Sequence, residues 1–233
     1  MIDRTHAYDW QQAAPAMAAG GNLVLPALLS PQECASLAAL YDDDARFRSR
    51  VVMARHGYGQ GEYRYFAYPL PSLVAELRTG LYARLAPVAN RWREQLGEPG
   101  RFPDAHADYL AGCHAAGQRR PTPLLLRYGP GDWNALHQDL YGAQVFPIQV
   151  AVLLSAPGRD FTGGEFVLTE QRPRRQSRAE VVPLAQGDAV AFAVAQRPVA
   201  TTRGWSRVQM RHGVSRLRGG QRHTLGLIFH DAA

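Results

Sequence analysis

The hydrophobic pattern changes to a period of two in the second half of the chain, and this change limits the folds open to it. From residue 122 onward the content of β-branched residues also rises. Both features predict β-strands. We expect eight short strands, at residues 122–128, 134–139, 146–154, 164–169, 179–183, 188–194, 206–212 and 221–230. Eight short strands favour a double-sheet jelly roll, whose mouth can hold a metal.

The first half of the chain is expected to be mostly helical, with a few strands. Ser30 followed by Pro31 is typical of a helix start, because Ser caps the first turn and Pro suits the first helical position. Apolar residues between 73 and 96 recur at helical spacing and predict an amphipathic helix packed on the sheet, which Pro87 should kink or split. Residues 113–121 are expected to form a loop.

These patterns together predict an α+β fold with a double-stranded β-helix core, or jelly roll, and N-terminal supporting helices. We expect one integrated domain. In it, residues 1–121 form a helical and strand support on the substrate side, and residues 122–233 form the catalytic core. A chain of 233 residues is large enough to bury such a core.

Composition indicates the cellular compartment that we expect for the protein. No apolar run reaches about eighteen residues, so we expect no transmembrane helix. The N-terminus lacks the charged-then-apolar pattern of a signal peptide. The two cysteines, Cys34 and Cys113, have no partners at metal-binding spacing, so we expect buried thiols in a reduced, cytoplasmic setting.

The chain carries a net charge of +6, and all 26 of its basic residues are Arg. One interpretation is an anion-binding surface, because the guanidinium group matches phosphate geometry. The other is a GC-rich genome, which favours Arg codons over Lys codons. The charge is compatible with nucleic acid as a partner, and both interpretations stay open.

Three residues have the chemistry of a metal site. His137 and Asp139 are two apart in a predicted strand, so their side chains should share a face. His212 offers a third ligand far downstream. Two His and one carboxylate that leave coordination positions open are the facial triad of non-haem Fe(II) oxygenases. Arg222, further along, could hold the distal carboxylate of a 2-oxoacid co-substrate. Alone, a His-x-Asp pair is more often a surface turn or a capping Asp.

The order of these residues resembles that of the 2-oxoglutarate oxygenase superfamily. The stretch Asp160–Leu168 is similar to the Gly-Gly-Glu strand of its prolyl-hydroxylase-like branch, and Val182–Phe192 to the strand pair before the second His. The resemblance covers residues 122–230.

The spacing from Tyr128-x-Pro-Gly to Leu136-His-Gln-Asp139 is similar to that of the alkylated-DNA-repair demethylases. The whole chain resembles a bacterial oxygenase family presumed to demethylate damaged nucleic acid. Two positions depart from the repair demethylases, which carry Asn at the place of Leu126 and a second Arg at the place of Ile228.

The resemblance implies an Fe(II)- and 2-oxoglutarate-dependent dioxygenase that uses O2, hydroxylates C–H bonds and releases succinate and CO2; ascorbate could stimulate it. His137, Asp139 and His212 would bind the iron. Arg222 would bind the distal carboxylate of 2-oxoglutarate, with hydrogen bonds from Thr224 and Tyr128. The alternatives are an ion pair of Arg222 with Glu165 or Asp188, and a core aromatic role for Tyr128.

The resemblance leaves the substrate open between alkylated nucleic-acid bases and, as in the prolyl hydroxylases, a protein or peptide. A non-catalytic metal-binding jelly roll is a third alternative, in which Arg222 would have no co-substrate to hold. The oligomeric state is also open.

A basic and aromatic cluster comprises Arg55, His56, Tyr58, Tyr63, Arg64 and Tyr65. Aromatic rings that stack on bases and Arg that binds phosphates are typical of single-strand binding. The alternative is an ordinary strand pair with a polar outer face. Another basic group, which includes Arg174 and Arg175, falls in a predicted loop and is either a substrate contact or a solvated hairpin.

Overall fold

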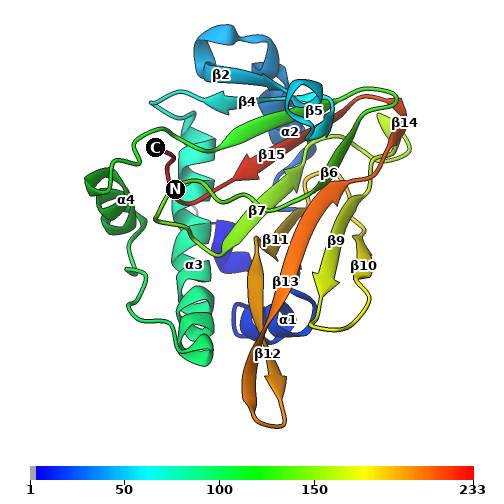
Figure 1. Cartoon of the computed structure of the whole chain (residues 1–233). Coiled ribbons are helices and arrows are strands. Elements are labelled where there is room, and N and C mark those ends of the chain that lie inside the picture. Colours follow the sequence, from blue (N-terminus) through cyan, green and yellow to red (C-terminus); the bar gives the residue numbers. More distant parts are fainter. Residues whose placement is uncertain (1–3) are drawn as a thin grey trace.

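The structure is a computed structural model that describes residues 4–233, and its core is a pair of facing antiparallel sheets (Figure 1). The main sheet has seven strands in the order β1, β11, β7, β15, β5, β4, β2. Their bounds are β1 Asn22–Leu25, β11 Ala189–Ala193, β7 Ile148–Leu153, β15 Arg222–Leu227, β5 Leu124–Tyr128, β4 Glu62–Phe66 and β2 Phe47–Val52.

The second sheet has six strands: five lie in the order β10, β9, β13, β6, β3, and the sixth, β12, pairs with β13 outside that path. Their bounds are β10 Arg178–Val182, β9 Phe166–Gln171, β13 Gly204–Val214, β6 Trp133–His137, β3 Gly59–Gln60 and β12 Gln196–Thr201. A separate pair is formed by β8 Phe161–Gly163 and β14 Leu217–Gly220. Phe166 and Leu168 of β9, in the second sheet, pack against Ala151, Val190 and Phe192 of the main sheet.

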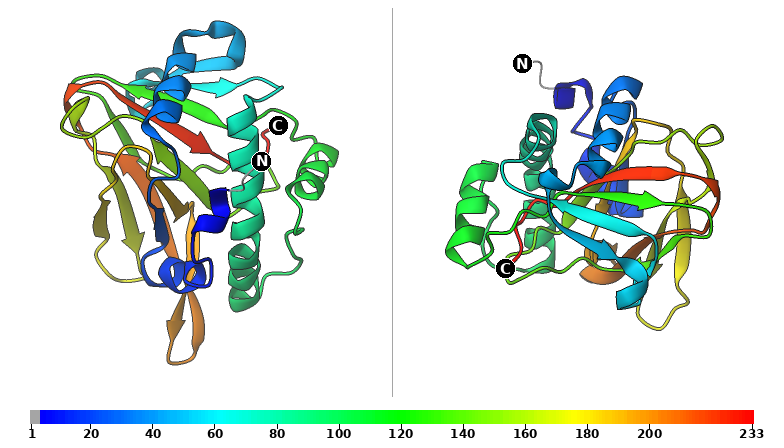
Figure 2. Two further views of the ribbon diagram at one scale, coloured as in Figure 1. Left: turned by 180° about the vertical axis from the view of Figure 1, so that it is seen from behind. Right: turned by 90° about the horizontal axis from the view of Figure 1, so that it is seen from above.

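Four α-helices are present among the described residues: α1 Ala13–Gly20, α2 Pro31–Ala39, α3 Ser72–Leu96 and α4 His106–Ala115. Helix α3 lies between α4 and the sheets in all views (Figures 1 and 2). Its residues Leu81 and Leu85 share one buried cluster with Val150 and Val152 of β7. Within residues 4–233, no helix combines the length and the apolar character needed for a membrane span. The two facing sheets and the helices packed beside them confirm the expected α+β fold with a jelly-roll core and supporting helices.

Successive side chains of β7 pack on opposite faces of the main sheet, one toward the helices and one toward the second sheet. All six of its residues are buried. Val150 and Val152 belong to the helix-side cluster, whereas Gln149 and Ala151 line a cavity between the sheets. Because successive side chains of a strand point to opposite faces, burial on both faces removes the simple polar–apolar alternation. Polar Gln149 in this strand therefore points inward, toward the second sheet.

Several local expectations were wrong. Pro87 does not split α3, which is continuous from Ser72 to Leu96. An interior Pro costs about 3 kcal/mol or more, but Leu85 and Val88 on either side of it are both buried and hold the helix on the core. Residues 113–115 belong to α4 rather than to a loop, and β8, β12 and β14 were not anticipated.

Candidate active site

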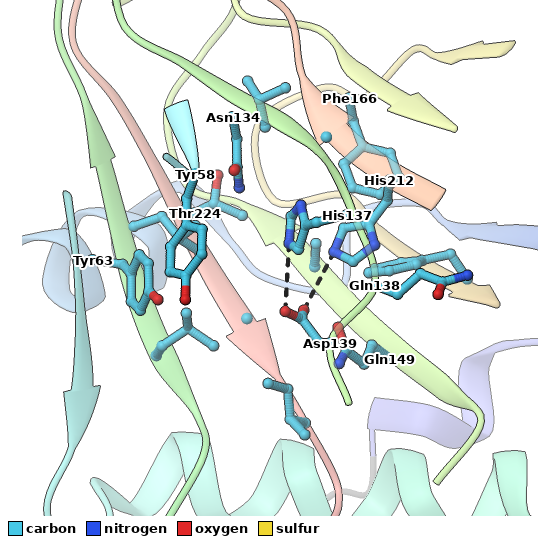
Figure 3. Close-up of a pocket in the computed structure, with 18 of the residues that line it drawn as sticks. Tyr58, Tyr63, Asn134, His137, Gln138, Asp139, Gln149, Phe166, His212 and Thr224 are labelled. Carbon is cyan, nitrogen blue, oxygen red and sulfur yellow. Dashed lines mark ion pairs between the residues drawn. The ribbon is translucent and has the colours of Figure 1, made fainter. Parts of the chain in front are cut away.

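The structure brings His137, Asp139 and His212 together, with one potential ligand atom from each within 4.8 Å of the others (Figure 3). Nε2 of His137 lies 3.4 Å from Oδ1 of Asp139, and Nε2 of His212 lies 3.3 Å from Oδ2. With metal–ligand bonds of about 2.1 Å, ligand atoms at right angles lie about 3 Å apart. The three side chains therefore have the spacing of one face of a metal coordination sphere.

Strand register places the two imidazoles opposite each other. His212 of β13 pairs directly with His137 of β6, and a register shift follows before Val214. A Cβ at Gly213 would lie 2.7 Å from the Asn134 carbonyl oxygen, so only glycine allows this approach of the strands. The ring centroids of the two His are 4.2 Å apart as a result.

The route of the chain to Asp139 differs from the expected strand. Strand β6 ends at His137, so Asp139 does not share a regular strand with it. Gln138 leaves the ladder, and its Nε2 donates to the carbonyl oxygens of Ala195 at 3.1 Å and Met210 at 2.8 Å. These bonds hold the segment after β6 and direct Asp139 between the two imidazoles.

The two imidazoles of the triad keep the Asp139 side chain in its ionised, carboxylate form. Burial raises the pKa of Asp139, but hydrogen bonds from His137 and His212 outweigh it and hold the pKa well below the ordinary value. Burial lowers the pKa of His212, which favours its neutral, metal-binding form. His137 bonds through Nδ1 to the Ala135 carbonyl oxygen at 2.7 Å, which leaves Nε2 to face Asp139.

Tyr141 joins the site without having been predicted. Its hydroxyl donates to Oδ1 of Asp139 at 2.7 Å. Burial raises the pKa of Tyr141, and the neighbouring carboxylate raises it further, so the hydroxyl keeps its proton. A hydrogen bond of this kind orients a ligating carboxylate. The only sequence signal was its position two residues after Asp139.

A cavity of about 260 Å³ opens beside the triad. Its main-sheet wall comes from β15, β5, β7 and the neighbouring β4. Arg222, Thr224 and Gly226 of β15 all line it, because residues two apart in a strand share a face. A Cβ at Gly226 would lie 2.7 Å from the Leu124 side chain, so glycine keeps this wall open.

Arg222 is a buried cation without a carboxylate partner among the described residues. It is 2% exposed, and its recorded hydrogen bond is from Nη1 to Oγ1 of Thr224, at 2.6 Å. Its Nε makes no hydrogen bond. The alternative ion pairs are not formed, because Glu165 bonds to Ser215 and Asp188 accepts from Ala27 and Ala185. Burial lowers the pKa of Arg222, as expected for an unbalanced charge.

Tyr128 faces the same end of the cavity. It pairs with Arg222 across β5 and β15, and the Arg222 guanidinium carbon lies 5.6 Å from its ring centroid. Its hydroxyl is buried and has no hydrogen-bond partner of ordinary geometry. Burial raises its pKa. The Arg222 Nε and the Tyr128 hydroxyl thus both lack a hydrogen-bond partner of ordinary geometry in residues that line one cavity, an arrangement that suits a bound anion.

The predicted substrate residues divide into two groups. Tyr58 and Tyr63 line the cavity, and Tyr65 packs edge-on against Tyr63 with ring centroids 5.4 Å apart. Arg55 is exposed in the turn before Tyr58. The structure does not bring Arg64 to the cavity, because its side chain alternates to the other face of β4, is buried and forms an ion pair with Asp44.

The second basic group also lies outside the cavity. Arg174 and Arg175 are exposed in the turn between β9 and β10, and neither lines the cavity. Three amide side chains that were not predicted also line the cavity: Asn134, Gln138 and Gln149. Periodicity gave no signal for Gln149, because it lies in a strand buried on both faces.

Comparison with known proteins identifies the family of the chain. A family model named Oxygenase-NA, described as an oxygenase catalysing oxidative methylation of damaged DNA, matches residues 61–232. An uncharacterized protein of Mycobacterium tuberculosis strain H37Rv is 54% identical over 168 residues, which are 72% of this chain and 72% of that protein.

Solved structures share the fold at low sequence identity. A prolyl-4-hydroxylase of Pseudomonas putida is 14% identical with a TM-score of 0.57, and the match covers 97% of this chain and 100% of that one. A 2OG-Fe(II) oxygenase family oxidoreductase of Burkholderia pseudomallei is 19% identical with a TM-score of 0.56, covering 97% and 94%. These likenesses establish the jelly-roll fold. Because the family model spans most of the chain, this protein belongs to the Oxygenase-NA family of oxygenase enzymes.

Proposed function

We propose that this protein is an Fe(II)- and 2-oxoglutarate-dependent dioxygenase that removes alkyl groups from nucleic-acid bases by oxidation. The observation that supports the cofactor assignment best is the pairing of the His137–Asp139–His212 triad with an unpartnered, buried Arg222 in one cavity. A triad alone suits many divalent metals. A buried guanidinium without a counter-ion also requires an anion. A dicarboxylate can reach both the metal at the triad and the guanidinium.

The residues present fit these two groups. Two imidazoles and one carboxylate would hold Fe(II) and leave positions open. Arg222 and the Tyr128 hydroxyl would bind the distal carboxylate of 2-oxoglutarate, and Thr224 would orient the guanidinium through its hydrogen bond. When bound, Fe(II) and 2-oxoglutarate supply the activation of O2 needed to hydroxylate a C–H bond, and 2-oxoglutarate leaves as succinate and CO2.

The protein supplies position and a closed environment. Tyr141 and Ala135 orient Asp139 and His137 through hydrogen bonds. Phe166 and Phe192 pack against the His212 ring, with centroids 6.2 and 4.6 Å away, and exclude water from that side. Hydroxylation of an N-methyl carbon gives an N-hydroxymethyl group. Its C–N bond then breaks, which releases formaldehyde and returns a proton to the nitrogen.

The choice of nucleic acid rests on the family description and on the cavity mouth. The family description names damaged DNA. Tyr58 lines the cavity yet is 49% exposed, and it stacks on His56 with ring centroids 5.3 Å apart. An exposed ring beside a narrow cavity suits a flipped or single-stranded base. Arg55, exposed three residues before Tyr58, is placed to contact phosphate.

A binding experiment tests the cofactor assignment. The purified protein should bind one Fe(II), or Mn(II) in air, and the His212→Ala variant should bind neither tightly. With Fe(II) and ascorbate the wild type should convert 2-oxoglutarate to succinate slowly even without a substrate. Stoichiometric metal in an Asp139→Ala, His212→Ala double variant would refute the triad as the metal site.

A substrate experiment tests the choice of nucleic acid. N-methylated single-stranded oligonucleotides should stimulate succinate formation and release formaldehyde, and proline-containing peptides should do neither. Tyr58→Ala should lose most of this stimulation, at about 1–3 kcal/mol for one base stack. Trp205→Ala is the matched control, because Trp205 is equally exposed, at 45%, but lies outside the cavity.

The effect of salt gives a second check. Binding to oligonucleotides should weaken as salt rises, and Arg55→Ala should make the slope shallower by about one phosphate contact. Salt-independent binding, or hydroxyproline formation without formaldehyde from any methylated oligonucleotide, would instead favour a peptide hydroxylase.

A further inference from the structure

Gln149 presents an unused hydrogen-bond donor to the cavity. The side chain lies on β7, is 4% exposed and lines the cavity beside the triad. Its Nε2 is buried and has no hydrogen-bond partner. Figure 3 shows the carboxamide next to Asp139, on the main-sheet side of the triad. A buried amide donor without a partner is costly, so its retention in an apolar strand points to a ligand.

The co-substrate of the proposed reaction carries two negative ends, and Arg222 would neutralise only one of them. The keto-acid end must lie at the triad, where the Asp139 carboxylate already places a negative charge. Among the described residues that line the cavity, Arg222 is the one Arg or Lys. The keto-acid carboxylate therefore needs a neutral donor near Asp139.

Other polar side chains of the cavity are engaged elsewhere. Gln138 donates to two main-chain carbonyls, and Tyr141 donates to Asp139. Thr224 is bonded to Arg222. Gln149 is the amide of the cavity whose buried Nε2 has no hydrogen-bond partner and lies beside Asp139.

The place of Gln149 in the sheet supports this role. Leu227 of β15 pairs with Val150 of β7, so Ile228 and Gln149 come next in the register, and both line the cavity. Ile228 is apolar, so the segment that follows β15 offers no side-chain donor at that end of the cavity, and the neighbouring strand β7 provides an amide there.

We propose that Gln149 is a positioning residue that donates a hydrogen bond from Nε2 to the keto-acid carboxylate of 2-oxoglutarate. The inference rests on the proposed function and adds the residue that orients the reacting end of the co-substrate. Gln149 would also select against ligands that place an apolar group there, because its donor would stay unpaired.

Calorimetric titration of Mn(II)-loaded protein with 2-oxoglutarate tests the proposal without turnover. Gln149→Leu keeps the volume and removes the donor, so the Kd for 2-oxoglutarate should rise about tenfold, as expected for a hydrogen bond to a charged group. Gln149→Glu, which adds a negative charge, should raise it further. The Kd for Mn(II) without 2-oxoglutarate should stay the same in Gln149→Leu.

Two controls separate the possible failures. Gln176→Leu makes the same chemical change at an exposed site between β9 and β10, outside the cavity, and should leave the Kd for 2-oxoglutarate unchanged. If Arg222→Met weakens 2-oxoglutarate binding but Gln149→Leu does not, or if Gln149→Leu weakens Mn(II) equally, the role of Gln149 is overturned while the proposed function stands. If the wild type itself fails to bind 2-oxoglutarate, the proposed function fails first.

Discussion

Replacing Arg222 by Met should show separately how the buried charge affects the free energy of unfolding and how it affects the affinity for 2-oxoglutarate. The side chain is 2% exposed, has no carboxylate partner among the described residues, and gives up one hydrogen bond, to Thr224. Arg197 offers a matched contrast, because it is 0% exposed but bonds to Glu170 and to the carbonyl oxygens of Ala18 and Ala19.

Without co-substrate, the Arg222→Met and Arg197→Met substitutions should affect the free energy of unfolding differently. Arg222→Met removes a desolvated, unpaired charge and loses about 1 kcal/mol of hydrogen bonding. Replacing buried ionic groups by apolar ones is often neutral or stabilising by about 1–4 kcal/mol. The free energy of unfolding should therefore stay level or rise. Arg197→Met takes one of two Arg partners from the buried Glu170, which keeps its bond to Arg172, and leaves the Ala18 and Ala19 carbonyls without their donor, so the free energy of unfolding should fall by about 1–3 kcal/mol.

2-Oxoglutarate should stabilise the wild type more than it stabilises the Arg222→Met variant. At 2-oxoglutarate concentrations of about 100 times the wild-type Kd, binding adds about 2.7 kcal/mol to the free energy of unfolding. A charge-assisted bond of about 1.5–3 kcal/mol lost at Arg222 raises the Kd by about tenfold or more. The same concentration should then stabilise Arg222→Met by about 1.4 kcal/mol or less.

Urea unfolding of Mn(II)-loaded protein, with and without 2-oxoglutarate, measures all of these differences. Arg197→Met should be destabilised but should keep its full gain from 2-oxoglutarate. The reasoning is refuted if Arg222→Met loses as much stability as Arg197→Met without co-substrate and still gains the wild-type increment with it. Arg222 would then be a structural residue, and another group would hold the distal carboxylate.

Two further predictions follow from hydrogen bonds that the structure shows. Tyr141→Phe removes the donor to Asp139 and should raise the Kd for Mn(II) by about 10–100-fold; an unchanged Kd by calorimetry would mean that Tyr141 does not orient the carboxylate. Asp231→Asn should lower the free energy of unfolding at pH 7 by about 3 kcal/mol, because it leaves Arg78 buried without its ion pair. Burial alone would raise the pKa of Asp231, but Arg78, His114 and Tyr68 together outweigh it and hold the pKa below the ordinary value. The stabilisation is therefore present above the unfolded pKa and is lost as pH falls through the folded pKa. Urea unfolding from pH 7 to pH 3 should show the difference narrowing, and a constant difference would contradict the role of the charge.

The sequence alone predicted the parts of the site that depend on local order along the chain. The period-two pattern after residue 122 predicted the sheets, because a half-buried strand alternates its side chains. His137, Asp139 and His212 stood out as a group by residue type and order, and the structure brings them together.

Tertiary structure decided everything that depends on which strands are neighbours. The sequence suggested Arg64 as a phosphate contact, but the fold turns it toward Asp44 and away from the cavity. Arg222 could have paired with Glu165, and only the three-dimensional arrangement leaves it without a carboxylate. Gln149 carried no sequence signal, since a strand buried on both faces has no alternation to mark the inner side. Spacing along a strand encodes the face of a side chain, but its partner is set by register between strands distant in sequence.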